Sequence, residues 1–292
     1  MKIGFIGLGV MGYHMAGHLA QKSGAAVTVY NRTHSKAEKW QQAHPDHSSA
    51  DTIAACVKDA DLVMLCVGDD SDLEQILLDP ETGAIAHMKA GSILIDHTTA
   101  SAAIARRIAD QAKTAAIDFL DAPVSGGEVG AVNGQLSIMV GGDQAVFDKV
   151  LPLLDHYAKA VNLIGAHGAG QLTKMVNQIC IAGLVQALSE GVAFGVNAGL
   201  DMDKVLAAIS GGAAGSWQMQ NRATTMVKDE FDFGFAIDWM RKDLRICLEE
   251  ANQNQSQLPI TAIIDQFYAV LQAQGKGRQD TSSLIQNLLR AK

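Results

Sequence analysis

A glycine-rich run near the N-terminus has the residue types and spacing that bind phosphate groups. The pattern G-x-G-x-x-G is formed by Gly7-Leu8-Gly9-Val10-Met11-Gly12. It follows an apolar run and opens a helical pattern, within a strand–helix–strand unit over residues 1–33. The first glycine allows a tight turn, the second lets backbone approach a pyrophosphate, and the third lets helix and strand pack closely. Because N–H groups at a helix start favour anions, the sequence predicts a dinucleotide site here.

The residues after the second apolar run distinguish between the common dinucleotides. A site for NAD usually has Asp or Glu at this position, where the carboxylate binds the ribose 2′-hydroxyl. This chain has Asn31-Arg32-Thr33 instead, with Lys36 close behind. A guanidinium attracts a 2′-phosphate and stacks on adenine, and the Thr33 hydroxyl can donate a hydrogen bond. The charges favour NADP over NAD, although a solvated surface arginine fits the same pattern.

Two further strand ends are expected to face the same crevice, because ligands of parallel sheets bind at the carboxyl ends of the strands. The backbone of Cys66 and Val67 is expected to line the cofactor. Asp69 and Asp70, which follow, fit a helix cap better than chemistry. Thr99 has a hydroxyl suited to a contact near the nicotinamide, and a helix-capping threonine is the alternative.

Short Val-, Ile- and Leu-rich runs that alternate with helical patterns have to position these groups. Strands are expected at residues 2–7, 26–31, 62–67, 93–96, 119–124 and 136–142, and a helix at residues 11–23. These runs are continuously apolar rather than alternating, as in strands covered on both faces. The alternation predicts an α/β fold with a Rossmann-type, doubly wound parallel sheet.

The second half of the chain reads as helical throughout. One long helix is expected over residues 171–198, followed by helices at 202–210, 216–229, 237–254 and 259–274. Small residues along the long helix would let other helices approach it closely. The sequence therefore predicts a dinucleotide-binding domain at residues 1–165 and an all-helical substrate and oligomerisation domain at residues 166–292, built on the long interdomain helix.

Four segments together resemble the β-hydroxyacid dehydrogenase family, which includes 3-hydroxyisobutyrate dehydrogenase and tartronate semialdehyde reductase. They are IGFIGLGVMGYHMA at the N-terminus, DAPVSGG at residues 121–127, GAGQLTKMVNQ at 168–178 and KDL at 242–244. They occur in family order and cover essentially the whole chain. The second and third segments are more specific than the glycine pattern alone.

The resemblance implies NAD(P)-dependent interconversion of a 3-hydroxy acid and its semialdehyde. Lys174 matches the catalytic lysine, and Ser125, Gly126 and Gly127 match the loop that binds the substrate carboxylate. Asn177 matches a substrate-binding asparagine, with Gln178 where many members have a second one. The resemblance also implies that Lys242 lies near the cofactor and that Thr99 contacts it. This chain departs from the family pattern at His97 and Thr98.

The predicted reaction needs a proton donor beside the carbonyl oxygen, because hydride transfer to an aldehyde builds negative charge there. A lysine ammonium serves when partial burial makes its proton easier to lose. Asn177 and Gln178 lie three and four residues after Lys174, so the three share one helix face. Without the family pattern, Lys174 would be read as an ordinary helix lysine.

The substrate is expected to be a short carboxylate-bearing hydroxy acid or semialdehyde. Glu128-Val129-Gly130 follow the Ser125 loop, where relatives acting on succinic semialdehyde tend to have basic residues. We expect 3-hydroxyisobutyrate first and tartronate semialdehyde second. An imine reductase or a non-catalytic dinucleotide-binding module are the alternatives, and both fit the set of Lys174, Asn177 and Ser125 less well. A homodimer or homotetramer is expected.

Composition limits the other partners. The formal net charge is −8, which does not favour nucleic acid. The four cysteines form no CxxC pair and are expected to be buried thiols, and the scattered histidines give no metal site. The first apolar run leads into the glycine pattern and a helix, so it is not expected to be a signal peptide. The apolar stretch at 179–198 is interrupted by polar residues, so no membrane span and a cytoplasmic location are expected.

Overall fold

The structure is a computed structural model in which residues 1–289 are described. The chain divides into two compact units, Met1–Lys174 and Met175–Lys292, each with its own core. The division falls inside one long helix, later than the boundary expected after residue 165. That boundary stays a prediction.

The first unit is built on a nine-stranded sheet in the order β3-β2-β1-β4-β5-β6-β8-β7, with β9 paired to β8. Strands β1 to β6 pair with one another in parallel, as the sequence predicted. The strands are β1 (Lys2–Ile6), β2 (Ala26–Tyr30), β3 (Ser48–Ser49), β4 (Leu62–Leu65), β5 (Ile93–Asp96), β6 (Asp118–Asp121), β7 (Val124–Ser125), β8 (Leu136–Gly142) and β9 (Ala158–Gly165).

The sheet is mixed rather than wholly parallel, because β8 runs antiparallel to both β6 and β7. The chain turns back after β7, where Val124 pairs with Ile138, and only a short helix separates the two strands. A parallel neighbour needs a longer crossover connection that returns the chain to the starting edge of the sheet. The expected strand at 136–142 is therefore present but reversed.

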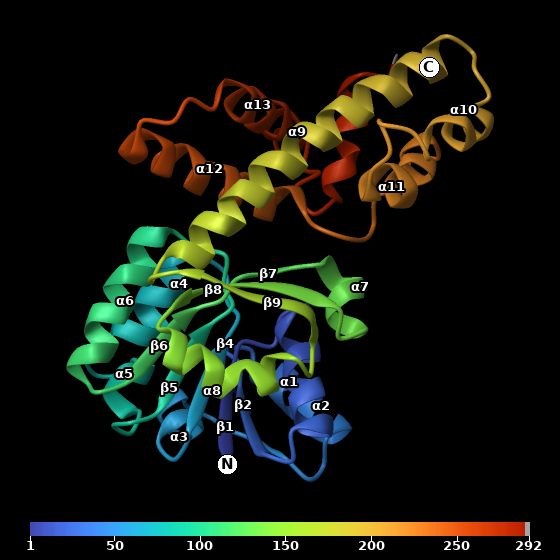
Figure 1. Ribbon diagram of the computed structural model, residues 1–292. Helices are drawn as coiled ribbons and strands as arrows, with labels where there is room; N and C mark the ends of the chain where they lie inside the picture. Colours follow the sequence, from blue (N-terminus) through green and yellow to red (C-terminus); the bar gives the residue numbers. More distant parts are fainter. Residues whose placement is uncertain (290–292) are drawn as a thin grey trace. The chain divides into compact units, whose positions relative to one another are not determined.

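Helices cover both faces of this sheet (Figure 1). Alternate residues of β1 explain this, since Ile3 and Phe5 join one core cluster and Ile6 joins the other. One face is covered by α1 (Gly12–Lys22), α2 (His34–Ala43), α7 (Gly127–Val132) and α8 (Gln144–Leu154). The other is covered by α3 (Ile53–Val57), α4 (Asp70–Leu73), the π-helical turn Glu74–Leu78, α5 (Ala84–His87) and α6 (Ala102–Thr114).

In the described residues that follow β9, every regular element is helical, as expected. They are α9 (Ala169–Asn197), α10 (Met202–Ile209), α11 (Trp217–Val227), α12 (Ile237–Asn254), α13 (Pro259–Ala273) and a 3₁₀-helix at Thr281–Asn287. Residues of α9 join both core clusters of the second unit: Ala182 and Val185 join one, and Leu188 and Val192 join the other. The long helix is thus the centre of this unit's packing.

Helix α9 corrects one expectation. By length and composition alone it is apolar enough to cross a membrane, with a mean hydropathy of 1.7 over its most apolar window. The core helix of a globular protein passes the same test, and α9 buries Gln186 and Ser189 together with its apolar residues. Two of the four cysteines, Cys56 and Cys247, are buried as expected, whereas Cys180 on α9 is exposed.

Candidate functional site

The glycine loop has the geometry that its sequence predicted. Gly7 has a φ of 93°, and an added Cβ there would lie 2.3 Å from the Cys66 carbonyl oxygen. A Cβ on Gly12 would lie 2.0 Å from the Gly7 oxygen, so helix α1 and strand β1 approach too closely for any side chain. A Cβ on Gly9 would meet nothing within 4 Å. The middle glycine therefore borders open space, which leaves room for a pyrophosphate.

Asn31 supports the loop through its side chain. Its Oδ1 accepts a hydrogen bond from the Leu8 N–H at 2.8 Å, and its Nδ2 donates to the Thr33 carbonyl at 3.0 Å. The end of β2 is thus tied to the loop that follows β1. The sequence predicted Asn31 as a cofactor residue, and its amide is engaged with the protein's own backbone. Its contribution to a nucleotide site is to fix the loop.

Arg32 lies beside this support, with 78% of its side chain exposed. Its Nη1 forms an ion pair with Asp72 Oδ1 on α4 at 3.2 Å. The Asp72 Oδ2 accepts the Gly68 N–H at 3.1 Å. The sequence pointed to Arg32 but not to its acidic partner, because nothing in the local pattern relates positions 32 and 72.

The ends of β4 and β5 are joined to each other by hydrogen bonds. The Thr98 hydroxyl accepts the Val67 N–H at 3.0 Å, and Asp96 Oδ1 accepts the Thr98 N–H at 2.8 Å. Asp69 caps α4 by accepting the Ser71 and Asp72 N–H groups, as expected. Helix α6 is capped by Ser101, so the capping alternative for Thr99 is wrong. The predicted cofactor roles of Cys66, Val67 and Thr99 stay predictions.

Asp96 and His97 at the end of β5 are both fully buried. Burial raises the pKa of the Asp96 carboxyl to about 7, against the hydrogen bonds from Thr98. Burial also lowers the pKa of His97 to about 4, so its imidazole is neutral near pH 7. Its two nitrogens lie 2.7 Å from the Ala122 oxygen and 2.8 Å from the Tyr157 hydroxyl. His97, which departs from the family pattern, therefore supports the sheet rather than a proton transfer.

Lys174 lies on α9 with only 7% of its surface exposed, which is rare for a lysine. One turn earlier, Gln171 is fully buried and holds the loop after β5 with both ends of its amide. Its Oε1 accepts the Ala100 N–H at 3.0 Å, and its Nε2 donates to the Thr98 carbonyl at 2.7 Å. The helix that carries the predicted catalytic lysine is thereby fixed to the loop that carries Thr99.

Asp121 fixes the start of the same helix. Its carboxylate accepts the Gly168 N–H at 2.7 Å and the Gln171 N–H at 3.0 Å, and burial raises its pKa. Gly141 and Gly170 give this carboxylate its space, since a Cβ on either would lie within 2.9 Å of it. Asp121 belongs to the DAPVSGG segment, yet nothing in its sequence context connects it with α9. Asp121 and Gln171 are the positioning groups that the sequence reasoning missed.

The predicted carboxylate loop forms the turn between β7 and α7. Gly126 has a φ of 136° and Gly127 a φ of 61°, a region that other residues rarely adopt. Both glycines are exposed and Ser125 is half-buried. The turn thus presents a hydroxyl beside backbone N–H groups that carry no side chain, and such groups can bind a carboxylate.

The second unit gathers the other predicted residues. Asn177 Nδ2 donates to Gln178 Oε1 at 2.8 Å, and Gln178 Nε2 donates to Asp243 Oδ2 at 2.6 Å. The Lys242 ammonium lies 3.0 Å from Asp243 Oδ1. Asp243 is buried and connects α9 to α12 through these contacts. It stands in the KDL segment, but only the structure shows that it joins Gln178 to Lys242.

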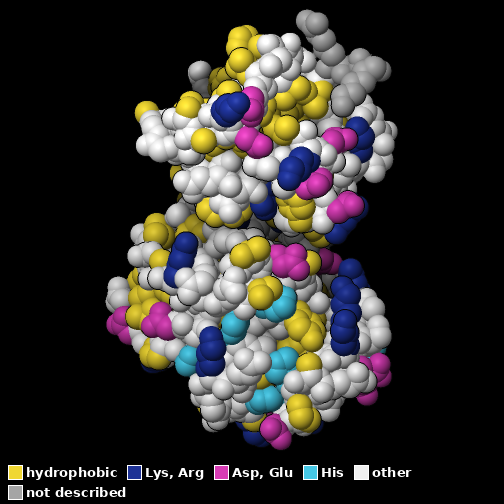
Figure 2. Space-filling model, turned by 90° about the vertical axis from the view of Figure 1, so that its right-hand side faces the viewer, with side chains coloured by type: hydrophobic (Ala, Val, Ile, Leu, Met, Phe, Trp, Pro, Cys, Tyr) yellow, Lys and Arg dark blue, Asp and Glu magenta, His cyan; other side chains and the backbone are white. Residues whose placement is uncertain are grey.

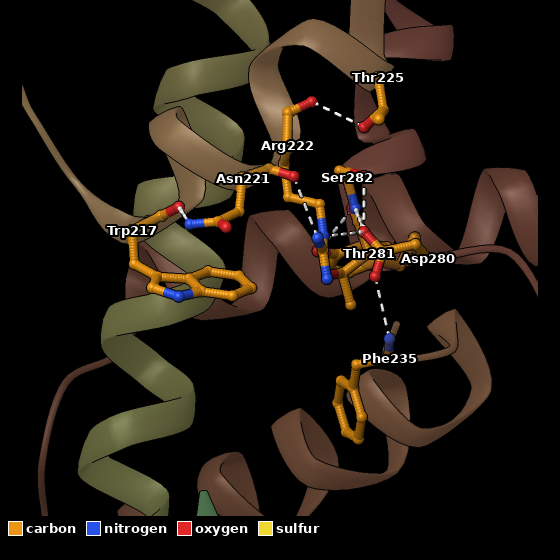
Figure 3. A network of polar contacts seen from close by, with 9 residues as sticks. Trp217, Asn221, Arg222, Thr225, Phe235, Asp280, Thr281 and Ser282 are labelled. Atoms are coloured by element: carbon orange, nitrogen blue, oxygen red, sulfur yellow. Dashed lines mark hydrogen bonds and ion pairs between the residues drawn. The ribbon is translucent and has the colours of Figure 1, made fainter. Parts of the chain in front are cut away.

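An arginine of the second unit that could serve a substrate carboxylate is engaged inside the protein. Arg222 forms an ion pair with the buried Asp280 at 3.3 Å and lies over the rings of Trp217 and Phe233. Figure 3 shows Arg222 reaching Asp280, whose carboxylate also accepts the Phe235 N–H. Arg241 is paired in the same way with Asp265 at 2.9 Å, and both pairs are structural.

The histidines are less scattered than the sequence suggested. Figure 2 shows several gathered on one face of the nucleotide-binding unit, and His14, His18 and His44 line a cavity of about 300 Å³. His44 stacks on Trp40, and His18 Nε2 contacts the Ala131 and Val132 carbonyls at the end of α7. In residues 1–289 no three His, Cys, Asp or Glu side chains are arranged to hold a metal ion.

Two family models match the chain. Residues 2–165 match the NAD binding domain of 6-phosphogluconate dehydrogenase, and residues 168–288 match the model described as NAD-binding of NADP-dependent 3-hydroxyisobutyrate dehydrogenase. Together the models span nearly all described residues, and each coincides with one half of the fold.

Individual relatives agree over the full length. An uncharacterized oxidoreductase from Shewanella frigidimarina is 56% identical over 98% of this chain and 98% of its own. The 2-hydroxy-3-oxopropionate reductase of Escherichia coli is 36% identical over 99% and 97% of the two chains. The structure of Mycobacterium tuberculosis 3-hydroxyisobutyrate dehydrogenase with L-serine has a TM-score of 0.89 at 27% identity, covering 99% of each chain.

Proposed function

The chain belongs to the β-hydroxyacid dehydrogenase family of NAD(P)-dependent oxidoreductases, and on that premise we propose that it uses NADP to interconvert a small 3-hydroxy acid and its semialdehyde. Lys174 acts as the general acid and base. The observation that carries this proposal is the burial of Lys174 one turn after Gln171, on a helix held against the loop that bears Thr99.

Two features of the nucleotide site support the choice of NADP. The open space beside Gly9 accommodates a pyrophosphate, and Arg32 stands at the end of β2, where an NAD site has a carboxylate. When bound, the nicotinamide supplies or accepts the hydride. We propose five further cofactor contacts: Thr33, Cys66, Val67, Thr99 and Lys242.

The chain's own groups handle the carboxylate and the proton. The Ser125 hydroxyl and the N–H groups of Gly126 and Gly127 bind the substrate carboxylate, and the Asn177 amide orients the substrate. The Lys174 ammonium donates its proton to the oxygen that gains negative charge during reduction. In the reverse direction the neutral amine accepts the proton of the alcohol. Gln178, whose amide is bound to Asp243, contributes by holding its part of the helix.

Two substrates are proposed, in order. The first is 3-hydroxyisobutyrate, which is supported by the names of the second family model and of the Mycobacterium tuberculosis structure. The second is tartronate semialdehyde, which is 2-hydroxy-3-oxopropionate, the compound in the name of the Escherichia coli relative. Both are short, in keeping with Glu128 and the apolar Val129 after the carboxylate loop.

We propose a homodimer or homotetramer for the assembly. One face of α13 is apolar and is not covered by other residues in the range 1–289, as the exposed side chains at helical spacing show: Ile260, Ile263, Phe267 and Val270. Sedimentation of the purified protein tests this, and a monomer at micromolar concentration would contradict it.

The function is tested with a panel of short semialdehydes and hydroxy acids, each assayed with NADPH or NADP and with NADH or NAD. We expect turnover with three- and four-carbon acids that have a carboxylate, and a higher kcat/KM with the phosphorylated cofactor. Aldehydes without a carboxylate should react poorly, because the Ser125 turn then has no partner. Equal turnover of carboxylate-free aldehydes would contradict the proposed substrate class.

A further inference from the structure

The ion pair between Arg32 and Asp72 spans the nucleotide-binding loop. Arg32 follows β2, and Asp72 lies on α4, which follows β4. Both strands pair with β1, one on each side, and β1 leads directly into the loop at Gly7. The contact at 3.2 Å therefore joins the two segments that border the loop.

This position coincides with the place where a dinucleotide must lie. The strand order reverses between β1 and β4, and open α/β sheets bind dinucleotides in the crevice at that reversal. With a pyrophosphate at the glycine loop, the adenosine ribose reaches the end of β2. The group that meets a 2′-phosphate there is Arg32, which is already paired with a carboxylate.

Asp72 is directed toward Arg32 by its own contacts. Its Oδ2 accepts the Gly68 N–H at 3.1 Å, which leaves Oδ1 facing the guanidinium. The two preceding acidic residues face other partners, because Asp69 caps α4 and Asp70 accepts the Ser101 N–H at 2.8 Å. Within this acidic run, Asp72 is the member whose carboxylate meets Arg32.

We propose that Asp72 is a specificity-determining residue that competes with the 2′-phosphate of NADP for Arg32. To bind the phosphate, the guanidinium has to exchange one anionic partner for another, and the released carboxylate remains near the new negative charge. NAD has no 2′-phosphate, so its binding requires no such exchange. The pair, rather than Arg32 alone, sets the preference between the two cofactors, and Asp72 makes that preference weaker. This inference rests on the proposed use of NADP.

The test is the dissociation constant of the full-length protein for NADPH and for NADH, measured by titration without substrate. Asp72→Asn removes the charge but keeps an oxygen for the Gly68 N–H. We expect it to tighten NADPH binding by about fivefold, the size that loss of an exposed ion pair allows, and to change NADH binding by less than about twofold. A variant that improves binding separates this role from a structural one, since damage to the loop would weaken both cofactors.

Glu74→Gln is the matched control. It removes the same charge two residues later, where the carboxylate is paired with Arg107 instead. It should change neither the dissociation constant for NADPH nor that for NADH by more than about twofold. Unchanged or weaker NADPH binding in Asp72→Asn would overturn the inference.

Arg32→Gln distinguishes a failure of this inference from a failure of the proposed cofactor choice. It should weaken NADPH binding, and adding Asp72→Asn to it should then have a smaller effect than in the native protein. An equal effect in both backgrounds would overturn the competition for Arg32. If Arg32→Gln leaves the ratio of NADPH to NADH affinity unchanged, the proposed cofactor choice fails and this inference with it. If that ratio falls but Asp72→Asn changes nothing, this inference alone fails.

Discussion

Buried carboxylates are held differently in the two units of the protein. In the nucleotide-binding unit, Asp96 and Asp121 accept hydrogen bonds from backbone N–H groups, and burial raises the pKa of both. In the helical unit each buried carboxylate also has a cation: Asp243 is paired with Lys242, and Asp280 is paired with Arg222 in addition to the N–H groups of Phe235 and Ser282. Both arrangements fix backbone segments or helices, and the helical unit adds the charge of a lysine or an arginine.

The difference follows from what each unit has to position. The crevice at the strand ends is formed by loops. A carboxylate that accepts backbone N–H groups there holds a loop or the first turn of a helix in place. N–H groups beyond the first turn of a helix are already paired, so a carboxylate in the middle of a helix, such as Asp243, is stabilised by side chains and a cation instead. The two kinds of contact are therefore expected to differ in energy and in pH dependence.

The largest effect on stability is expected at the ion pair of the helical unit. Arg222→Met would leave the Asp280 charge, which is 2% exposed, without its cation, and should lower the free energy of unfolding by about 3 kcal/mol. Arg245→Met, in an exposed pair with Glu249, should cost less than about 1 kcal/mol. Denaturant unfolding of both variants measures the contrast. Adding Asp280→Asn to Arg222→Met should restore part of the loss, and equal losses in Arg222→Met and Arg245→Met would contradict the comparison.

A smaller effect, of about 2 kcal/mol, is expected at Gln171. Gln171→Met leaves the Ala100 N–H and the Thr98 carbonyl buried without a partner. Because these groups fix the loop that bears Thr99 relative to Lys174, kcat should fall more than tenfold as well. The control is Gln186→Met on the same helix, whose amide donates to Glu190. A kcat for Gln171→Met equal to that of the control would show that the amide has no positioning role.

The smallest effect is expected in the pH dependence of the native protein's stability, because two buried groups have pKa shifts of opposite sign. Asp96, with a folded pKa of about 7, keeps its proton while the unfolded chain loses it, so its contribution to stability falls as pH rises from about 4 to 7. His97, with a folded pKa of about 4, stays neutral while the unfolded chain binds a proton below about 6.5, so its contribution rises with pH over nearly the same window. The two slopes oppose each other.

Replacing either residue should expose the slope of the other. The free energy of unfolding of Asp96→Asn, minus that of the native protein, should rise between pH 4.5 and 6.5. For His97→Gln the same difference should fall. Urea unfolding at several pH values measures both, and two differences that do not change with pH would contradict the assignment.

Local sequence predicted the elements but not the contacts between distant segments. The apolar runs, the glycine loop and the Asp69 cap depend on neighbouring residues, and the structure has each of them. The reversal of β8 depends on how the chain turns after β7, which strand periodicity does not report. The length of α9 was predicted from sequence, but its hydropathy was underestimated because the polar residues within 179–198 were taken to interrupt the apolar stretch.

The groups that hold the candidate site in place could not be predicted from sequence, because their partners are distant along the chain. Asp121 and Gln171 are separated by 50 positions, and Arg32 and Asp72 by 40. A carboxylate or amide in an apolar stretch does not indicate which N–H or guanidinium it will meet. Lys174 itself looked like an ordinary helix lysine until the family pattern was considered, and its burial is visible only in three dimensions.

The central claim is that Lys174 transfers the proton that accompanies hydride transfer, and the kcat of Lys174→Ala tests it most directly. With the best semialdehyde of the panel and saturating NADPH, we expect kcat to fall by about a thousandfold, while NADPH binding stays within about twofold. Lys113→Ala, at an exposed helix lysine, should leave kcat unchanged. A Lys174→Ala variant that binds NADPH and turns over at the native rate would contradict the account.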